Sequence, residues 1–171
     1  MNILIREMQT LDVVLIMEIE KVSFGSHHWS TQSFYSEINN PYGNYIVALD
    51  KDTSNIVGYC GFWLIFEEAH ITTIAVKPEF KKNKIGELLL QQMINDGYKR
   101  EAKWFTLEVR AGNIPAQNLY YKYGFESLGV RSKYYQDNNE DALIMWTQNI
   151  WDEKFKNRFN KLKEELSVVF N

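Results

Sequence analysis

A glutamate in the middle of a strand-like segment is the first residue of this sequence that could do chemistry. Glu108 lies in WFTLEVR, residues 104–110, where apolar and polar residues alternate as they do on the two faces of a strand. Glutamate is disfavoured in strands, which makes this position unusual. Glu108 could act as a general base, or it could be a solvated residue paired with Arg110 or another neighbour. The pattern alone leaves both interpretations open.

Tyrosines are concentrated just after this strand. The segment PAQNLYYKYGF, residues 115–125, predicts a helix with Pro115 in its first turn and Gly124 at its end. The hydroxyl of Tyr120 could donate a proton to a leaving group. Tyrosines at helical spacing also pack cores with the hydroxyl at the edge, so the spacing does not choose between these roles.

A basic loop before another predicted helix could bind an anion. Residues 77–90 read KPEFKKNKIGELLL, which places lysines and several free backbone N–H groups at the start of a helix. A charged loop of this kind can equally be solvated surface. Phosphate binding is therefore a hypothesis at this point.

A metal site is not expected. His27 and His28 stand side by side before Trp29, but no acidic residue or cysteine lies nearby at the spacing of metal ligands. Packing or surface exposure explains each histidine equally well.

Charge composition excludes a general electrostatic footprint for nucleic acid or an anionic membrane. The chain has 19 basic and 22 acidic residues and a net charge of −3, so any charged site must be local. Glu67 and Glu68, which follow a long apolar strand pattern, could attract a basic substrate or could be a solvated strand end.

The cellular setting follows from cysteine usage and the absence of apolar targeting segments. Cys60 is the single cysteine, so no disulfide can form within the chain, which fits a reducing compartment. The first ten residues have no apolar core like that of a signal peptide, and no later stretch reaches membrane-spanning length. We expect a soluble cytoplasmic protein without a membrane partner.

Helix and strand patterns alternate along one compact domain. Strand patterns fall at residues 2–6, 44–50, 56–68, 69–78, 104–110, 127–135 and 141–148, and helix patterns at 11–24, 30–38, 86–100 and 115–125. This order predicts an α/β (α+β) fold with one mixed sheet covered by helices. From Trp151 an amphipathic helix follows, so we expect a domain at 1–149 and a helical extension at 150–171 packed on it, or else on a partner.

Three segments together resemble a known family. ITTIAVKPEFKKNKIGELLLQQMI, LEVRAGNIPAQNLYYKYGF and YYQDNNEDALIMW are similar to the acetyl-CoA-binding core and C-terminal arm of the GNAT N-acetyltransferase superfamily. The whole pattern, over about residues 2–147, is most similar to the bacterial branch that acetylates the N-terminal alanine of a ribosomal protein. The resemblance implies a central, mostly antiparallel sheet of six or seven strands, splayed where acetyl-CoA binds as co-substrate, and no metal.

The resemblance also assigns roles to individual residues. It implies that Glu108 is the general base and Tyr120 the general acid. It implies that acetyl-CoA contacts Ile74, Ala75, Val76, Lys81, Lys82, Asn83, Lys84, Ile85, Gly86 and Asn113, and that the acceptor contacts Trp29, Tyr134 and Tyr135. Lys84 departs from the family pattern, which has glycine there; a positive φ would strain lysine, although its ammonium could pair with phosphate.

The acceptor is the least constrained part of this prediction. The expected partner is the N-terminus of a ribosomal protein, with no direct contact to nucleic acid and with a monomer or weak dimer as the enzyme. A lysine side chain, another protein N-terminus or a small-molecule amine is the alternative acceptor. A different class of protein, an acyl-CoA-binding module that has lost turnover and works through its C-terminal helix, also fits Lys84 and the tail.

Overall fold

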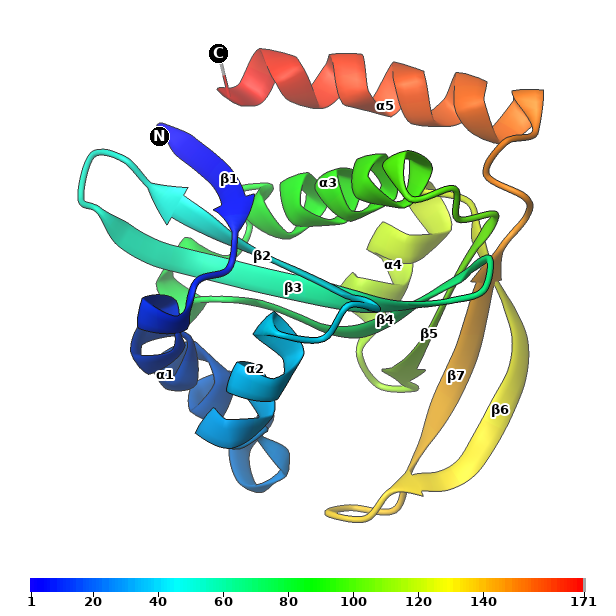
Figure 1. The fold of residues 1–171 in the computed structure, drawn as a ribbon. Coiled ribbons are helices and arrows are strands. Elements are labelled where there is room, and N and C mark those ends of the chain that lie inside the picture. Colours follow the sequence, from blue (N-terminus) through cyan, green and yellow to red (C-terminus); the bar gives the residue numbers. More distant parts are fainter. Residues whose placement is uncertain (171) are drawn as a thin grey trace.

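The computed structural model of this chain describes residues 1–170. Within these residues seven strands form one sheet, in the order β1-β2-β3-β4-β5-β7-β6 (Figure 1). The strands are β1 Ile3–Glu7, β2 Gly43–Asp50, β3 Asn55–Ile65, β4 Glu68–Val76, β5 Trp104–Arg110, β6 Phe125–Tyr135 and β7 Glu140–Thr147. The α-helices are α1 Val13–Phe24, α2 Thr31–Ile38, α3 Ile85–Lys99, α4 Ile114–Lys122 and α5 Glu153–Phe170.

The β4–β5 pair differs from every other pair in the sheet. Strands β1 to β4 pair in antiparallel order, and β7 pairs antiparallel with both β5 and β6. Strands β4 and β5 run parallel and pair only through Glu68–His70 and Trp104–Thr106, after which they diverge. The expectation of a mixed, mostly antiparallel sheet that splays is therefore confirmed.

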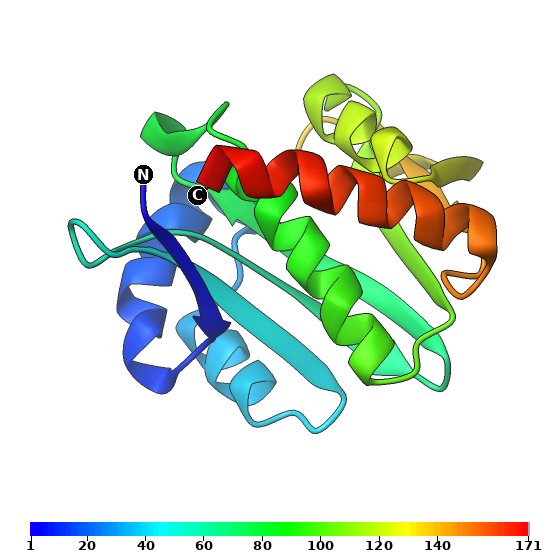
Figure 2. The same ribbon diagram turned by 90° about the horizontal axis from the view of Figure 1, so that it is seen from above.

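Helices α3, α4 and α5 cover one face of the sheet, and α5 lies across α3 (Figure 2). Phe159 and Leu162, two members of the apolar stripe predicted for the tail, are buried in the main core. The side-chain amide of Gln91 on α3 donates to the Leu162 carbonyl at 3.0 Å, and the Trp151 indole N–H donates to the Ala102 carbonyl at 2.8 Å. The tail helix thus packs on the domain through both apolar and polar contacts.

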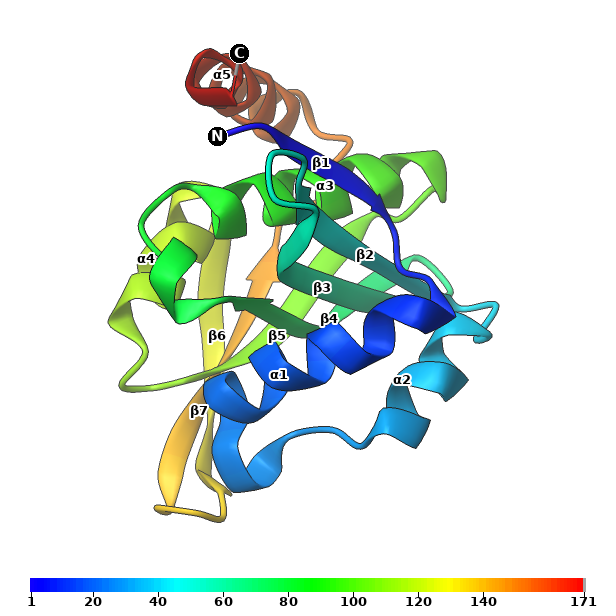
Figure 3. The ribbon, with the colours of Figure 1, turned by 90° about the vertical axis from the view of Figure 1, so that its left-hand side faces the viewer.

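Helices α1 and α2 lie on the opposite face, against β2, β3 and β4 (Figure 3). They form a second core cluster with those strands, in which Ile16 and Phe34 from the helices pack with Tyr45, Tyr59 and Ala75. On this face, the two helices therefore cover the half of the sheet that β2, β3 and β4 form.

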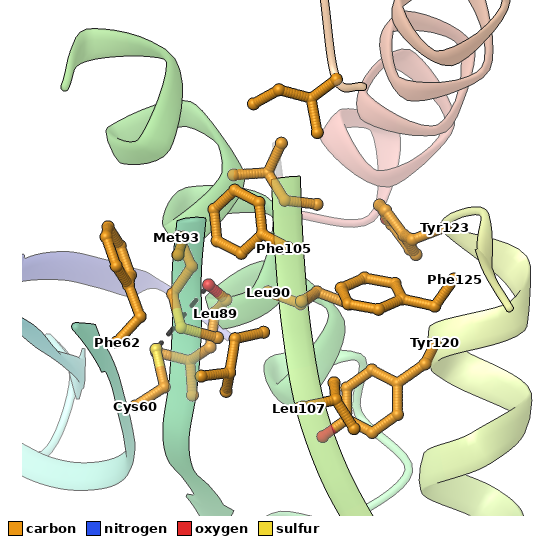
Figure 4. Close-up of a cluster of buried hydrophobic side chains, with 14 of the residues drawn as sticks. Cys60, Phe62, Leu89, Leu90, Met93, Phe105, Leu107, Tyr120, Tyr123 and Phe125 are labelled. Atoms are coloured by element: carbon orange, nitrogen blue, oxygen red, sulfur yellow. Dashed lines mark hydrogen bonds between the residues drawn. The ribbon is translucent and has the colours of Figure 1, made fainter. Parts of the chain in front are cut away.

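The same side of β5, β6 and β7 is left uncovered by helices in the described residues, and we call it the open face. Alternation along β5 directs its two sets of side chains to opposite sides. Phe105 and Leu107 are buried toward α3 and α4 (Figure 4), as the sequence predicted, and Val109 is buried in the same core cluster, whereas Glu108 on the open face is exposed.

Helix α3 approaches β5 so closely that only glycine fits at the contact. A Cβ atom at Gly97 would lie 2.5 Å from Cζ of Phe105. Phe105 cannot easily move, because it is fully buried and packs edge-on against Phe62 with ring centroids 5.5 Å apart. This contact sets the distance between α3 and the strand that carries Glu108.

Replacing Gly97 with alanine should therefore destabilise the fold, although alanine is the better helix former. We expect Gly97→Ala to lower the free energy of unfolding by about 1–2 kcal/mol, because overpacking against Phe105 exceeds the gain in helix propensity. Urea denaturation measures this change. The matched control is Gly129→Ala on β6, whose Cβ would meet only the Ile144 Cδ1 atom at an ordinary 3.7 Å. A Gly97→Ala protein as stable as the wild type would refute the close contact.

Candidate active site

The gap between β4 and β5 exposes backbone polar groups in the interior of the sheet. Lys77 N–H donates to the Val57 carbonyl at 2.9 Å, and hydrogen bonds alternate along an antiparallel pair. The N–H and C=O groups of Ile74 and Val76 therefore point away from β3 and toward the gap. Because β5 pairs with β4 only as far as His70, these groups are free to bind an extended ligand that carries amides.

The loop after β4 presents a row of amide groups at the start of α3. Within residues 1–170, the backbone N–H groups from Lys82 through Glu87 meet no hydrogen-bond acceptor, whereas Leu88 N–H closes the first helical turn on the Lys84 carbonyl. Free amides at a helix N-terminus favour an anion. The loop that includes Asn83, Ile85 and Gly86 thus presents free amides that can bind an anion, and diphosphate binding stays a prediction.

Two lysines of this loop have left-handed backbones. Lys82 has φ 66° and Lys84 has φ 64°, conformations that cost a non-glycine residue about 1–2 kcal/mol. The expected conflict at Lys84 is therefore real, because a lysine occupies a backbone position suited to glycine. Its ammonium group lies 3.1 Å from Glu87 Oε2, so it is directed to a neighbouring carboxylate in this structure.

Glu87 joins the loop to the end of α4. Its side chain is only 6% exposed and receives hydrogen bonds from Lys84, Lys122 and the Tyr123 hydroxyl. Burial raises the pKa of Glu87, but these donors outweigh it and hold the pKa below its usual value. The sequence pattern predicted no role for this residue, and its position in the first turn of α3, directly after a lysine-rich loop, was the available signal.

Glu108 lies on the open face at the diverging part of β5. Its side chain is 35% exposed, and Oε1 lies 3.5 Å from the Arg131 guanidinium on β6. The alternative that Glu108 pairs with Arg110 is wrong, because Arg110 binds Asp137 and Glu140 instead. A half-exposed carboxylate of this kind can accept a proton from a bound amine or from a water molecule.

Tyr120 lies on the other side of β5, within the core. Its ring extends from α4 beside Leu107, with the hydroxyl directed toward β5 (Figure 4). The residue is 4% exposed, and within residues 1–170 its hydroxyl has no hydrogen-bond partner. Burial raises the pKa of Tyr120, with smaller contributions from Cys60 and Tyr135, so the hydroxyl keeps its proton at neutral pH.

The β6–β7 hairpin brings Tyr134 and Tyr135 to the open face. Arg110 packs its guanidinium 3.9 Å from the Tyr135 ring centre and binds Asp137 at the hairpin tip with two hydrogen bonds. Burial raises the pKa of Tyr135 to about 12, against the opposing charge of Arg110. Arg110 thereby fixes the hairpin that the resemblance assigned to the acceptor.

The segment between α1 and α2 approaches the same hairpin. His27 Nε2 lies 3.8 Å from Asp137 Oδ1. Trp29 packs against Phe34, with ring centroids 5.4 Å apart, and its backbone N–H donates to the buried carboxylate of Glu20 at 2.7 Å. Trp29 is therefore half-buried against the second core cluster, where it packs the loop onto the domain, and its contact with the acceptor stays a prediction.

Asn113 stands at the start of α4 rather than inside the gap. Its side-chain oxygen accepts the Ala116 N–H at 3.3 Å and caps the helix. The side-chain amide of Gln117 holds the preceding turn by donating to the carbonyls of Arg110 and Ala111 at 2.9 Å. The polar end of α4 is thus fixed beside the diverging end of β5.

Residues 1–170 contain neither a cluster of metal-ligating side chains nor a helix of membrane-spanning kind. Histidine, cysteine, aspartate and glutamate side chains form no group of three or more that could hold a metal ion there. In the same part of the chain, every helix is too short or too polar to cross a bilayer.

Comparison with known proteins identifies this arrangement. The sequence model of the Acetyltransferase (GNAT) family matches residues 13–125. A Bacillus subtilis protein named as a candidate ribosomal protein bS18-alanine N-acetyltransferase is 44% identical over 143 residues, which cover 83% of this chain and 93% of that protein. The ribosomal protein bS18-alanine N-acetyltransferase of Escherichia coli K12 is 30% identical, with 82% of this chain and 94% of the relative covered.

Solved structures agree with the sequence matches. The crystal structure of the ribosomal-protein-S18-alanine N-acetyltransferase from Escherichia coli superposes with a TM-score of 0.76 at 28% identity, and covers 85% of this chain and 92% of that one. The splayed sheet, the free amides before α3 and the family match lead to one conclusion: this chain belongs to the GNAT acetyltransferase family and has its fold.

Proposed function

We propose that this protein transfers the acetyl group of acetyl-CoA to the α-amine of the N-terminal alanine of ribosomal protein bS18. The observation that carries the proposal is the placement of Glu108 and Tyr120 on the two sides of β5, along the gap that β4 leaves. The relatives named for this activity, at 30% and 44% identity over most of their length, support the choice of acceptor.

The chain's own groups fit acetyl-CoA. The free edge of β4 at Ile74 and Val76 would hold the amide-containing arm, and the amides from Lys82 through Glu87 would hold the diphosphate. Lys81 ends the 3-10 turn before the loop, and Asn113 caps α4, so a bound acetyl-CoA would reach them only beyond these groups. When bound, acetyl-CoA supplies an acetyl group already activated as a thioester.

Proton transfer is divided between the two sides of β5. A neutral amine attacks a carbonyl carbon, and Glu108 accepts the proton released from the amine as the C–N bond forms, directly or through water. The buried Tyr120 hydroxyl, which keeps its proton at neutral pH, donates to the departing sulfur. Direct transfer of this kind uses no nucleophilic side chain of the enzyme and no metal ion.

An N-terminal α-amine needs less help from a general base than a lysine side chain does. With a pKa near 8, about a tenth of an α-amine is neutral at pH 7, whereas a lysine with a pKa near 10.4 is neutral only about once in a few thousand molecules. Tyr134 and Tyr135 on the hairpin, with Trp29 behind the facing loop, would border the acceptor. One chain carries all of these groups, so we propose a monomer or weak dimer that works in the cytoplasm, where ribosomal proteins are made.

The two proposed proton-transfer residues give a matched pair of tests. Glu108→Gln and Tyr120→Phe should each lower kcat/KM at least about tenfold, because each removes one proton transfer. The assay is thiol release from acetyl-CoA with a peptide that copies the alanine-starting N-terminus of bS18, with mass spectrometry to locate the acetyl group. The Glu108→Gln defect should shrink as pH rises from 7 to 9, because the α-amine then loses its proton to solvent.

Tyr121→Phe is the control for this test, since Tyr121 is on the same helix but 45% exposed to solvent. It should retain wild-type turnover. Acetyl groups found on lysine side chains would move the assignment to another amine. Acetyl-CoA binding without acetylation of any amine offered would favour a module that binds acyl-CoA without turnover.

The left-handed lysine of the loop gives a second test. Lys84→Ala and Lys84→Gly both remove the ion pair with Glu87, but only glycine removes the backbone strain. We expect the glycine variant to be about 1 kcal/mol more stable to urea than the alanine variant. Because the Lys84 ammonium is directed to Glu87, both variants should bind acetyl-CoA, measured by calorimetry, within about threefold of wild type. A tenfold loss in both would mean that the ammonium binds phosphate.

A further inference from the structure

A cavity lies on the open face, at the end of the sheet where β4 and β5 are still paired. Thr106 separates it from the end where the two strands diverge. Its volume is about 320 Å³, and we call it the tryptophan pocket. It is lined mainly by Glu68, Trp104, Glu126, Leu128, Trp146 and Gln148. Strand register explains how distant residues meet there, because Glu68 pairs with Trp104 and Glu126 pairs with Trp146.

The tryptophan pocket lies on the same side of β5 as the proposed acceptor site. Trp104 and Glu108 are on the same side of β5, four residues apart, and Trp146 faces Thr106 between them. At a rise of about 3.3 Å per residue, the near side of the pocket is about 7 Å from Glu108 along the strand and the far side about 13 Å. In an extended peptide with its amine at Glu108, the second to fourth residues lie about 3 to 10 Å along the backbone, and a long side chain adds the remaining reach to the pocket.

Two carboxylates of the pocket lack a strong cationic partner. Among the ion pairs of residues 1–170, Glu68 meets only His70, at 3.0 Å, and Glu126 takes part in none. The neighbouring Glu67 differs, because Lys103 lies 2.6 Å from it. The sequence suggested that Glu67 and Glu68 attract a basic substrate. Of these two, only Glu68 lacks a lysine or arginine partner within the described residues, and Glu126 is the second carboxylate available for this role.

The indole rings make the pocket selective for one kind of cation. Trp104 and Trp146 line the pocket, and the His70 ring packs edge-on against Trp146 with ring centroids 6.2 Å apart. Indole faces attract a guanidinium or ammonium group as well as its hydrocarbon stem. A planar guanidinium can stack on an indole while its N–H groups donate to a carboxylate. A pocket with two indoles and two carboxylates thus matches an arginine side chain, and a lysine less fully.

We infer that the tryptophan pocket binds the side chain of a basic residue, arginine in preference to lysine, at the second to fourth position of the acceptor. This inference rests on the proposed function for the location of the acceptor amine at Glu108. It adds a sequence requirement that Glu108 and Tyr120 do not impose. The enzyme would then select among proteins that begin with alanine by the positive charge that follows.

Matched peptides that differ by one charge test the inference. Alanine-starting peptides carry a single arginine at position 2, 3 or 4, or citrulline, its uncharged analogue, at the same position. In the wild type, citrulline at the preferred position should raise KM about five- to tenfold and leave kcat nearly unchanged. In Glu126→Gln that ratio should fall below about twofold. Glu126 is exposed, so this variant should fold normally.

Glu164→Gln is the matched control, because Glu164 is an exposed glutamate on α5, outside the open face. It should keep the full ratio between arginine and citrulline peptides. Trp146→Leu should reduce the ratio as Glu126→Gln does. Equal KM values for the two peptides in the wild type, or a ratio that survives in Glu126→Gln, would overturn the inference while the proposed reaction stands.

Calorimetric titration of the same peptides separates failure of the inference from failure of the proposed function. If no peptide is acetylated, the proposed acceptor is wrong. The calorimetric binding of the arginine and citrulline peptides then tests whether the pocket binds a basic side chain. Arginine-selective binding that disappears in Glu126→Gln would support a site for a basic side chain. Equal binding of the arginine and citrulline peptides, or no binding of either, would overturn it.

Discussion

Parallel strands that separate after three residue pairs leave peptide groups without partners inside a sheet, and the rest of this molecule is arranged around that gap. The chain leaves β4 and β5 at their diverging ends, and each strand is followed by a helix, α3 after β4 and α4 after β5. Both helices therefore begin near the wide end of the gap. Helix α3 directs free amides to it, whereas the first amides of α4 are already bonded to Gly112 and Asn113. One irregularity of strand pairing thus creates the polar edge, the anion-binding loop and access from one face of the sheet to the other.

Two buried glutamates hold the segments that border this gap. Glu87 receives donors from Lys84 and from the end of α4, and Glu20 accepts the backbone N–H of Trp29 and the hydroxyl of Tyr59. A carboxylate taken out of water is costly unless several donors reach it, so each glutamate selects the loop conformation that supplies those donors. Burial raises the pKa of Glu20, whereas the donors around Glu87 lower its pKa on balance. The conformations of the loop before α3 and of the loop before α2 therefore depend on the buried carboxyl groups of Glu87 and Glu20.

The sequence was sufficient for the order of elements, for the two faces of β5 and for the family. Local periodicity decides the first two features, and the alternation around Glu108 is unchanged in the structure. The family followed from the resemblance of three segments to the GNAT superfamily. Long-range register was not accessible: Arg131 reaches Glu108 only because the β6–β7 ladder has irregularities on both sides of it. The same reason hid the tryptophan pocket, in which Trp104 and Trp146 meet from strands far apart in the sequence. The left-handed backbone at Lys84 could not be predicted from the sequence, because lysine, unlike glycine, has no preference for a positive φ.

The contact between α5 and α3 extends to the loop before α3. Gln91 donates to the Leu162 carbonyl and to the Tyr123 hydroxyl, and Tyr123 donates to Glu87, so a buried chain of hydrogen bonds links the tail helix to that loop. Hydrogen bonds in such a chain polarise one another, so the loss of one end weakens the others. The family match ends at residue 125, so a helix outside the matched region supports the loop that presents the free amides. Substitutions in the tail helix thereby act on the loop at a distance.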